Sequence, residues 1–403
     1  MSILSNKRIM LGVTGSIAAY KAADLASKLT QAGAQVDVIL TGAAEKFVTP
    51  LTFQSVTGRR AYTDRDLWGN EAHVLHVGLG HAADLLVIAP CTANTIAKLA
   101  HGQADTLLTV TALAMRSPLL IAPAMDGGMY DHAVTQENIE KLKKSGATFI
   151  GPAEGHLASG LSGVGRLLET FEIVGYIRIL LGKDGPLAGK KVVVTAGGTQ
   201  EPLDPVRVIT NRSSGKQGYA LAQAALDMGA QVTLITTPTA LTPPVGARVI
   251  NLETAKEMLE AVLAESADSD ALVMASAVAD FRPKSMAKDK IKKEGGIPQI
   301  ELEGTEDILK AVAGQRAETK CPRVVVGFAA ESRDLLENAT NKLKSKGLDF
   351  IAANDISAGD AGFAVETNRV TLLFADGRSE SLPLISKAEV AEVILGWVSK
   401  LLE

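Results

Sequence analysis

Two loops of small residues have the composition of anion-binding turns. In "GVTGSIAAYK", Gly15 and Ser16 lie where an apolar, strand-like run ends and a helical pattern begins. "TNRSSGKQG" (210–218) likewise lies between a strand-like run and a helical pattern. Backbone N–H groups and hydroxyls at a helix N-terminus are suited to binding phosphate. Taken alone, the first loop is more typical of an ordinary Gly/Ser cap, because it lacks the G-x-G-x-x-G spacing of dinucleotide-binding loops.

Further polar side chains follow other predicted strands of the first half. Thr41 ends the second predicted strand, and "APCTANT" ends a later one with Thr92, Asn94 and Thr95. Because the carboxyl ends of parallel strands share one edge of a sheet, these residues should converge near the first loop. Their hydroxyl and amide groups suit hydrogen bonds to a polar ring such as the isoalloxazine of a flavin.

The elements that must position these loops follow an alternating pattern. Apolar runs alternate with amphipathic helical patterns, which predicts an α/β fold with two Rossmann-like domains, each a mainly parallel sheet flanked by helices. The expected strands are 8–15, 35–41, 84–90, 118–125 and 147–152, then 191–197, 231–237, 271–278, 324–330, 349–355 and 369–377. The expected helices include 17–32, 92–115, 135–145 and 387–402.

A break in this pattern marks the domain boundary. The stretch "LLGKDGPLAGKK" (180–191) carries three glycines and a proline. A chain of 403 residues is also too long for one ordinary core. We therefore expect two domains, 1–189 and 190–403.

The composition limits the expected cellular location and the expected binding partners. The net charge of -4 provides no overall basic field, so neither nucleic acid nor a membrane surface is expected as a partner. Two cysteines, Cys91 and Cys321, are too few for a disulfide framework. The N-terminal stretch lacks a signal-peptide apolar region, and no apolar run reaches the ~20 residues that span a bilayer. A reducing cytoplasm is the expected location.

Longer motifs resemble two enzyme families. "HVGLGHAAD" (76–84), "APCTANTIAKLAHGQADTLLT" (89–109) and "PAMDGGMY" (123–130) look like the flavin-dependent cysteine decarboxylases. "TAGGTQEPLDPVRVITNRSSGKQG" (195–218) and "SAVADF" (276–281) look like phosphopantothenate–cysteine ligase. In this order, over nearly the whole chain, they resemble the bacterial bifunctional coenzyme A biosynthesis family. This implies a flavoprotein fold in the first half and a ligase fold in the second.

The resemblance implies two consecutive reactions. Cysteine is joined to 4'-phosphopantothenate with CTP through an acyl-cytidylate, and the product is decarboxylated with FMN to 4'-phosphopantetheine. Mg2+ is the expected second cofactor, because charge around a triphosphate must be neutralised. The implied homo-oligomer has trimers of the first half and dimers of the second, which is compatible with a dodecamer. The choice of CTP over ATP rests on the resemblance alone.

The resemblance also assigns residues in the decarboxylase half. His76 occupies the position of the acid–base catalyst, whereas without the motif His73 and His81 would be equal candidates, and a surface or capping histidine the more common interpretation. The expected FMN positions are Gly15, Ser16, Ile17, Thr41, Thr92, Ala93, Asn94 and Thr95.

Two positions depart from the decarboxylase pattern. Asp126 replaces the asparagine that binds the substrate carboxylate, and a second carboxylate is repulsive there unless it is protonated or a cation intervenes. Ser159 replaces a cysteine that donates a proton in many members, and a hydroxyl is a far poorer acid than a thiol of pKa ~8.5. Cys91 substitutes only if it faces the flavin, although a buried inert cysteine is more common.

These departures leave three interpretations open. The first is an active decarboxylase in which Asp126 and Ser159 act as altered catalytic residues. The second is a ligase that carries a slowed or non-catalytic flavin domain as a scaffold. The third is a flavin-binding regulatory protein.

In the ligase half, the resemblance assigns the nucleotide site. Asn211 corresponds to the residue that helps to consume the acyl-cytidylate, a role that suits an oxyanion donor. Lys290 corresponds to the catalytic lysine and Asp280 to the residue that reads the nucleotide and holds Mg2+. Lys342 and Lys346 share a helix face, which alone would indicate a solvated surface. The expected CTP-binding residues are Asp280, Lys290, Glu306, Asp307, Ile308, Leu309, Phe328, Lys342 and Lys346; Glu306 replaces a proline of the family pattern.

Overall fold

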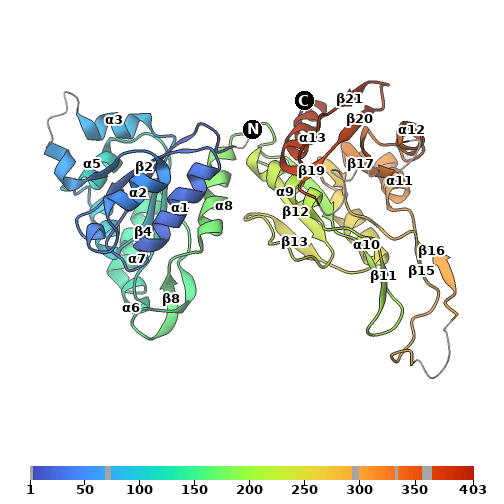
Figure 1. The fold of residues 1–403 in the computed structure, drawn as a ribbon, viewed down its shortest axis with the longest axis horizontal. Coiled ribbons are helices and arrows are strands. Elements are labelled where there is room, and N and C mark those ends of the chain that lie inside the picture. The colour runs from blue at the N-terminus through green and yellow to red at the C-terminus, as the bar shows by residue number, and fades with distance from the viewer. Residues whose placement is uncertain (1–2, 69–73, 293–298, 332–334, 356–364) are drawn as a thin grey trace. The chain divides into compact units, whose positions relative to one another are not determined.

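Two units follow one another along the chain in the computed structural model, which describes residues 3–68, 74–292, 299–331, 335–355 and 365–403 (Figure 1). Unit 1 is Met1–Leu181 and unit 2 is Gly182–Glu403. The division precedes the expected boundary because the intervening segment packs on unit 2. Leu187 is fully buried in the core of unit 2, its N–H donates to the Met228 carbonyl at 2.8 Å, and Ser399 Oγ donates to the Pro186 carbonyl at 3.3 Å.

Unit 1 is built on a six-stranded parallel sheet with the order β3-β2-β1-β4-β5-β6. The order reverses between β1 and β4, and ligands of such sheets bind outside the carboxyl ends of the strands at that switch point. The strands are β1 (Arg8–Val13), β2 (Gln35–Leu40), β3 (Ala61–Thr63), β4 (Leu85–Cys91), β5 (Leu119–Pro123) and β6 (Thr148–Phe149).

Helices cover both faces of this sheet, which explains why its central strands are apolar on both sides. Leu11 and Val13 of β1 belong to the core beneath α1, α2 and α8, whereas Met10 belongs to the core beneath α3, α4, α5 and α7. The helices are α1 (Ala19–Gln31), α2 (Pro50–Thr57), α3 (Leu75–Ala82), α4 (Ala93–Ala100), α5 (Leu107–Ala114), α6 (Gly127–Tyr130), α7 (Ala133–Lys144) and α8 (Thr170–Gly182).

Unit 2 contains an eight-stranded sheet with the order β13-β12-β9-β14-β17-β18-β20-β21. It is parallel from β13 to β18, and β20 and β21 continue it antiparallel. Its switch point lies between β9 and β14. The strands are β9 (Lys191–Ala196), β12 (Gln231–Thr236), β13 (Arg248–Asn251), β14 (Ala271–Met274), β17 (Val324–Glu331), β18 (Phe350–Asp355), β20 (Val370–Phe374) and β21 (Ser379–Ser381).

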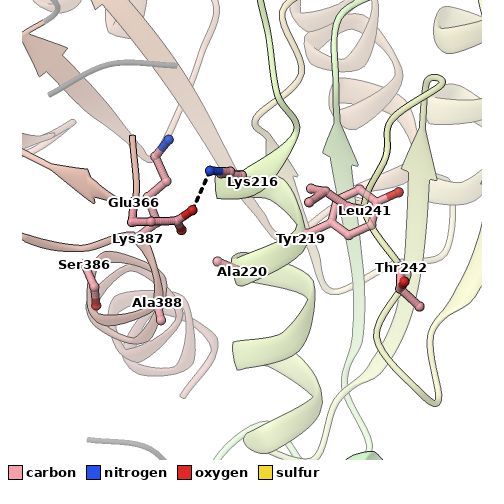
Figure 2. A pocket seen from close by; sticks show the side chains of 9 residues that line it. All are labelled: Lys216, Tyr219, Ala220, Leu241, Thr242, Glu366, Ser386, Lys387 and Ala388. Carbon is pink, nitrogen blue, oxygen red and sulfur yellow. Dashed lines mark hydrogen bonds and ion pairs between the residues drawn. The ribbon is translucent and has the colours of Figure 1, made fainter. Parts of the chain in front are cut away.

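Helices α9 and α13 pack on one face of the second sheet, and α10, α11 and α12 pack on the other. The first residue of α9 is Lys216 and the first residue of α13 is Lys387, and these two helix starts lie side by side (Figure 2). The helices are α9 (Lys216–Asp227), α10 (Ala255–Ser266), α11 (Ile308–Thr319), α12 (Leu335–Ser345) and α13 (Lys387–Leu402).

The structure contains a strand at each expected position but divides one expected helix. The predicted helix 92–115 is two helices, α4 and α5. Gly102, with φ 66°, follows the end of α4, and a capping box between Thr106 and Thr109 starts α5. The structure also contains unpredicted antiparallel strand pairs: β7 (Ala153–His156) with β8 (Ser162–Arg166), β10 (Gln200–Pro202) with β11 (Val208–Thr210), β15 (Phe281–Pro283) with β16 (Leu302–Gly304), and β19 (Thr367–Asn368) with β22 (Ile385–Ser386).

In the part of the chain that the structure describes, every helix is too short or too polar to cross a membrane. Over the same residues, His, Cys, Asp and Glu side chains form no group of three or more that could hold a metal ion.

Candidate active sites

A cavity of about 450 Å³ opens at the switch point of the first sheet. Its wall combines the loop after β1, Thr92 after β4, the loop after β5 and the β7–β8 hairpin. Hydroxyls are placed beside large apolar side chains there, including Ile17 and Tyr20, which are 58% and 62% exposed. The wall includes Gly15, Ser16, Ile17, Tyr20, Thr92, Met125, Asp126, Met129, Leu157, Ser159 and Leu167.

Thr14, which sequence reasoning missed, ties the two central loops together. Its buried hydroxyl donates to the Pro90 carbonyl at 2.8 Å and accepts from the Thr92 N–H at 3.0 Å. Gly15 is required for a close approach, because a Cβ there would lie 2.4 Å from the Cβ of Ala43. The loops that end β1 and β4 are therefore fixed against each other before any ligand binds.

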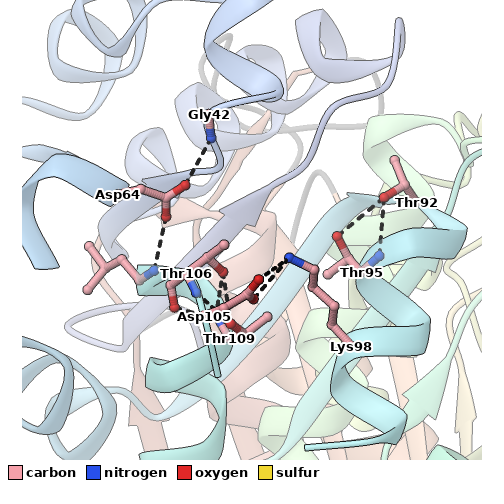
Figure 3. Close-up of polar contacts among 9 residues, drawn as sticks. Gly42, Asp64, Thr92, Thr95, Lys98, Asp105, Thr106 and Thr109 are labelled. Atoms are coloured by element: carbon pink, nitrogen blue, oxygen red, sulfur yellow. Dashed lines mark hydrogen bonds and ion pairs between the residues drawn. The ribbon is translucent and has the colours of Figure 1, made fainter. Parts of the chain in front are cut away.

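Only part of the predicted flavin set lines the cavity. Gly15, Ser16, Ile17 and Thr92 line it, whereas the described lining residues do not include Thr41, Ala93, Asn94 or Thr95. The Thr41 hydroxyl instead accepts from the Ala44 N–H at 3.3 Å. Thr95 is buried, and its hydroxyl lies 3.3 Å from that of Thr92, the N-cap of α4 (Figure 3).

The segment behind Thr92 is held by a polar network (Figure 3). Lys98 pairs with Asp105 at 2.7 Å, so the end of α4 is joined to the start of α5. Asp64 accepts from the backbone N–H groups of Gly42, at 3.1 Å, and Leu107, at 3.0 Å. This network joins the loop after β2 to α5 and supports the carboxyl edge of the sheet.

The two residues that depart from the decarboxylase pattern contact each other. Ser159, between β7 and β8, donates to Asp126 Oδ2 at 2.7 Å. Asp126 is the N-cap of α6, and its Oδ1 accepts from the Gly128 N–H at 3.0 Å. The hairpin lies close to this helix, because a Cβ on Gly165 would lie 2.2 Å from the Met125 carbonyl oxygen. Each carboxylate oxygen thus already accepts one hydrogen bond.

Cys91 and His76 lie away from this pair. Cys91 is fully buried at the end of β4, and burial raises the pKa of its thiol far above the usual range. A protonated thiol without access to the cavity is unsuited to replace the proton-donating cysteine whose position Ser159 occupies. His76 is half-buried on α3 and is not among the described residues that line the cavity of its own chain. The competing candidate His73 lies outside the described residues, and His81 is exposed.

A second cavity, of about 590 Å³, opens at the switch point of the second sheet. It is bounded by the start of α9, the loop after β14, the start of α11 and side chains of β17 and α12. Most residues of the predicted ligase site meet here: Asn211, Asp280, Glu306, Asp307, Ile308, Leu309, Phe328, Lys342 and Lys346. The common face expected for Lys342 and Lys346 therefore points into a cavity.

Lys290 is the predicted residue that the structure does not bring to this cavity. It is exposed on the segment after β15, and it is not among the described lining residues. The neighbouring Ile291 N–H donates to Asp204 Oδ2 at 3.1 Å, and Asp204 Oδ1 also accepts from the Val206 and Arg207 N–H groups. Burial acts to raise the pKa of Asp204, but these backbone hydrogen bonds prevail and lower it. A buried carboxylate therefore anchors the base of this segment.

Asn211 lies at the rim of the cavity with its amide orientation fixed. Its Nδ2 donates to the Val278 carbonyl at 3.0 Å and lies 3.5 Å from the Ala277 carbonyl. Because carbonyls only accept, Oδ1 is the atom directed away from these partners. The expected donor role would require the amide to release one of these carbonyls.

Sequence reasoning missed several residues that line the second cavity. Lys216 and Gln217 were part of a quoted motif without an assigned role, whereas Asn354, Asn368 and Lys387 carried no signal. Among the described residues, Asn354 Oδ1 and Asn368 Oδ1 are buried without a hydrogen-bond partner. Burial, and then the charge of Lys216, lowers the pKa of Lys387.

Comparisons with known proteins cover both units. A family model described as flavoprotein matches residues 2–182, and a model described as DNA/pantothenate metabolism flavoprotein C-terminal domain matches residues 187–402. The "Coenzyme A biosynthesis bifunctional protein CoaBC" of Bacillus subtilis (strain 168) is 46% identical over 99% of this chain and 98% of its own length. The protein of the same name from Vibrio vulnificus (strain CMCP6) is 42% identical over all of both chains. A solved C-terminal domain of a protein of this name is 41% identical, covers 54% of this chain and 98% of its own, and has a TM-score of 0.46.

Proposed function

Because this chain belongs to the family of bifunctional coenzyme A biosynthesis proteins, we propose that its two switch-point cavities are its two active sites. The protein is an enzyme that ligates cysteine to 4'-phosphopantothenate and decarboxylates the product. The cavity of unit 2 performs the ligation and the cavity of unit 1 the decarboxylation. A purely regulatory flavin-binding role is not favoured, because the chain matches bifunctional relatives over its full length.

The wall of the first cavity fits FMN. The flat faces of a flavin ring need apolar walls, which Ile17, Tyr20, Met125 and Met129 supply. Its phosphate needs N–H and hydroxyl donors at a helix N-terminus, and the loop of Ser16 before α1 has both. FMN supplies the reversible two-electron oxidation of the substrate thiol that lets CO2 leave, and the chain supplies binding and proton transfer.

Asp126 and Ser159 act together in this proposal. The Ser159 hydroxyl holds the β7–β8 hairpin against α6 through Asp126, which covers the cavity and excludes water. The same hydrogen bond occupies one carboxylate oxygen and reduces its repulsion toward a substrate carboxylate. Both residues therefore act by positioning the hairpin over the site, and Ser159 itself lines the cavity.

The position of His76 implies that decarboxylation requires a homo-oligomer. Its own chain does not place it at the cavity, so its acid–base role needs a second copy that brings α3 to the site. A homo-oligomer with trimeric contacts through unit 1 and dimeric contacts through unit 2 is therefore part of the proposal. His76→Gln should retain flavin binding and lose decarboxylation.

The second cavity is the proposed CTP site. Carboxylates of Asp280, Glu306 and Asp307 can accept hydrogen bonds from the nucleoside, and Phe328 offers an aromatic face. Asp280 is the proposed ligand of a Mg2+ ion that is shared with the phosphates. Lys290 joins the site only if the segment after β15 folds over the bound nucleotide.

One observation carries this proposal: each sheet has a cavity at its own switch point, lined by most of the residues expected for one of the two reactions. The absorbance spectrum of the purified protein tests the first cavity, because bound FMN gives flavin bands. Ser16→Trp should abolish these bands, whereas the exposed Ser55→Trp on α2 should not. A colourless wild-type protein that FMN cannot reconstitute would contradict the proposal for unit 1.

A further inference from the structure

One wall of the second cavity consists of residues that were not among the predicted site residues, although two of them belong to the loop of residues 210–218. We call Lys216, Gln217, Asn354, Asn368 and Lys387 the lysine wall; all five line the cavity. They come from four separate segments: the start of α9, the end of β18, β19 and the start of α13. Lys216 and Lys387 also line a neighbouring cavity of about 340 Å³ (Figure 2). The two lysines therefore line both of these cavities of unit 2.

The backbone of Lys387 is held on both sides. Its N–H donates to the Glu366 carbonyl at 2.9 Å, and its carbonyl accepts from Gln217 Nε2 at 3.1 Å. Gln217 Oε1 in turn accepts from Asn368 Nδ2 at 3.2 Å. Because the Lys387 carbonyl can only accept, it fixes the orientation of both amides. The first turn of α13 is therefore positioned by the first turn of α9.

The exposed carboxylate of Glu366 acts on both ammonium groups of this wall. Lys216 pairs with Glu366, whose side chain is 79% exposed (Figure 2). Lys387 is only 5% exposed, and burial and Lys216 lower its pKa while Glu366 opposes that change. A second anion at this wall would offset an unfavourable arrangement of like charges. The exposed Glu366 can withdraw into solvent at little cost and admit such an anion.

The rest of the cavity carries mixed charge. Its described lining has the carboxylates Asp280, Glu306 and Asp307 beside the cations Arg212, Lys342 and Lys346, and Asp307 pairs with Lys346 at 3.1 Å. Carboxylates suit the hydroxyl and amino groups of a nucleoside, and they repel its phosphates unless a cation such as the proposed Mg2+ lies between them. At the lysine wall, two lysines lie beside the N-terminus of α9, whose N-cap residue, Gly215, provides no side-chain cap. The cavity can therefore bind an elongated ligand with a polar neutral end and a polyanionic end.

We propose that Lys387, together with Lys216, binds the β- and γ-phosphates of CTP and stabilises pyrophosphate as it leaves. This inference rests on the ligase function proposed for unit 2. In the activation step, a carboxylate oxygen of 4'-phosphopantothenate bonds to the α-phosphorus while the bond from that phosphorus to the α–β bridging oxygen breaks. The electron pair stays on the bridging oxygen, and negative charge grows on pyrophosphate beside the two ammonium groups. Lys387 is thus a catalytic residue on the last helix of the chain.

Steady-state ligase assays with the full-length protein test this assignment. Lys387→Met should raise both the KM for CTP and the inhibition constant of inorganic pyrophosphate by about tenfold, the effect of losing one charge-assisted hydrogen bond. The KM values for 4'-phosphopantothenate and cysteine should change by less than about twofold, because they bind away from the lost charge. Lys387→Arg should restore most of the pyrophosphate inhibition. Lys400→Met, an exposed lysine of the same helix, is the matched control and should behave as wild type.

A second variant, with the opposite expected effect on pyrophosphate inhibition, keeps the inference testable if Lys387→Met misfolds. Glu366→Gln removes an exposed counter-charge and should tighten pyrophosphate inhibition by about twofold, as expected for a surface pair. The inference is overturned if Glu366→Gln leaves pyrophosphate inhibition unchanged, or if a folded Lys387→Met raises all three KM values alike. Wild-type protein that fails to ligate with CTP would instead overturn the proposed function, and with it this assignment.

Discussion

The hydroxyl of Ser159 lies 2.7 Å from Asp126 Oδ2, so the β7–β8 hairpin is bonded to the first turn of α6. Each residue departs from the expected decarboxylase pattern, and the structure brings the two into contact. With the Gly128 N–H on Oδ1, both carboxylate oxygens of Asp126 have a hydrogen-bond partner.

The pairing predicts that substitutions at the two positions are not additive. Asp126→Ala and Ser159→Ala should each lower kcat/KM for decarboxylation of 4'-phosphopantothenoylcysteine, and the double variant should be no slower than the slower single variant. The coupling energy in kcat/KM should be about 1 kcal/mol or more. Ser162→Ala, an exposed serine of the same hairpin, should have no effect. Additive losses would show that the hydrogen bond has no functional role.

Burial of Cys91 predicts slow chemical modification. Because burial raises the pKa of its thiol, the thiolate is scarce throughout the neutral range and increases only at strongly alkaline pH. In the native protein at pH ~8, near the ordinary thiol pKa, iodoacetamide should therefore react with the half-buried Cys321 and spare Cys91. Denatured protein, in which both should react, is the control, and peptide mass spectrometry separates the two sites. Rapid labelling of Cys91 in the native protein would make this residue a candidate proton donor again.

The burial of Leu187 predicts where unit 2 must begin. A fragment of residues 182–403 should fold, whereas 190–403 should be less stable by about 2–4 kcal/mol, because it loses a buried leucine and a backbone hydrogen bond. Urea denaturation measures the difference. Leu187→Ala in the longer fragment should reproduce most of the loss. Equal stability of the two fragments would place the segment before Lys190 outside the folded unit.

The fixed amide of Asn211 leads to a separate prediction for the ligase. Asn211→Ala should leave release of pyrophosphate largely intact and slow amide formation by about a hundredfold, as for the loss of one positioned polar group at a reacting carbonyl. Single-turnover measurements of pyrophosphate and of 4'-phosphopantothenoylcysteine separate the two steps. Parallel loss of both steps would show that Asn211 supports the loop at Val278 rather than the chemistry.

Local patterns predicted the fold better than they predicted the site. The strands of both sheets were recognisable because buried parallel strands are continuous apolar runs. The break between α4 and α5 was missed, although Gly102 and Thr106 are ordinary stop and start signals. The loops that follow the strands meet at one edge of each sheet, as the parallel strand order requires. The contact of Asp126 with Ser159 could not be predicted, because it depends on how the hairpin folds back.

The missed residues of unit 2 have the same physical origin. Lys216 and Lys387 are far apart in sequence, and only the packing of α9 against α13 places them on one wall. The motif that identified Lys290 gives its position in the sequence but not the path of its segment in space. Side chains that meet through tertiary packing leave no periodic signal in the sequence.

The most direct test of the two-site account is the stoichiometry of the two reactions in one protein. Purified full-length protein loaded with FMN receives 4'-phosphopantothenate, cysteine and CTP, and the yields of CMP and CO2 are measured together. We predict about one CO2 per CMP with 4'-phosphopantetheine as product, and CMP without CO2 from the fragment of residues 182–403. Accumulation of 4'-phosphopantothenoylcysteine without CO2 by the flavin-loaded full-length protein would contradict the account and leave unit 1 as a scaffold.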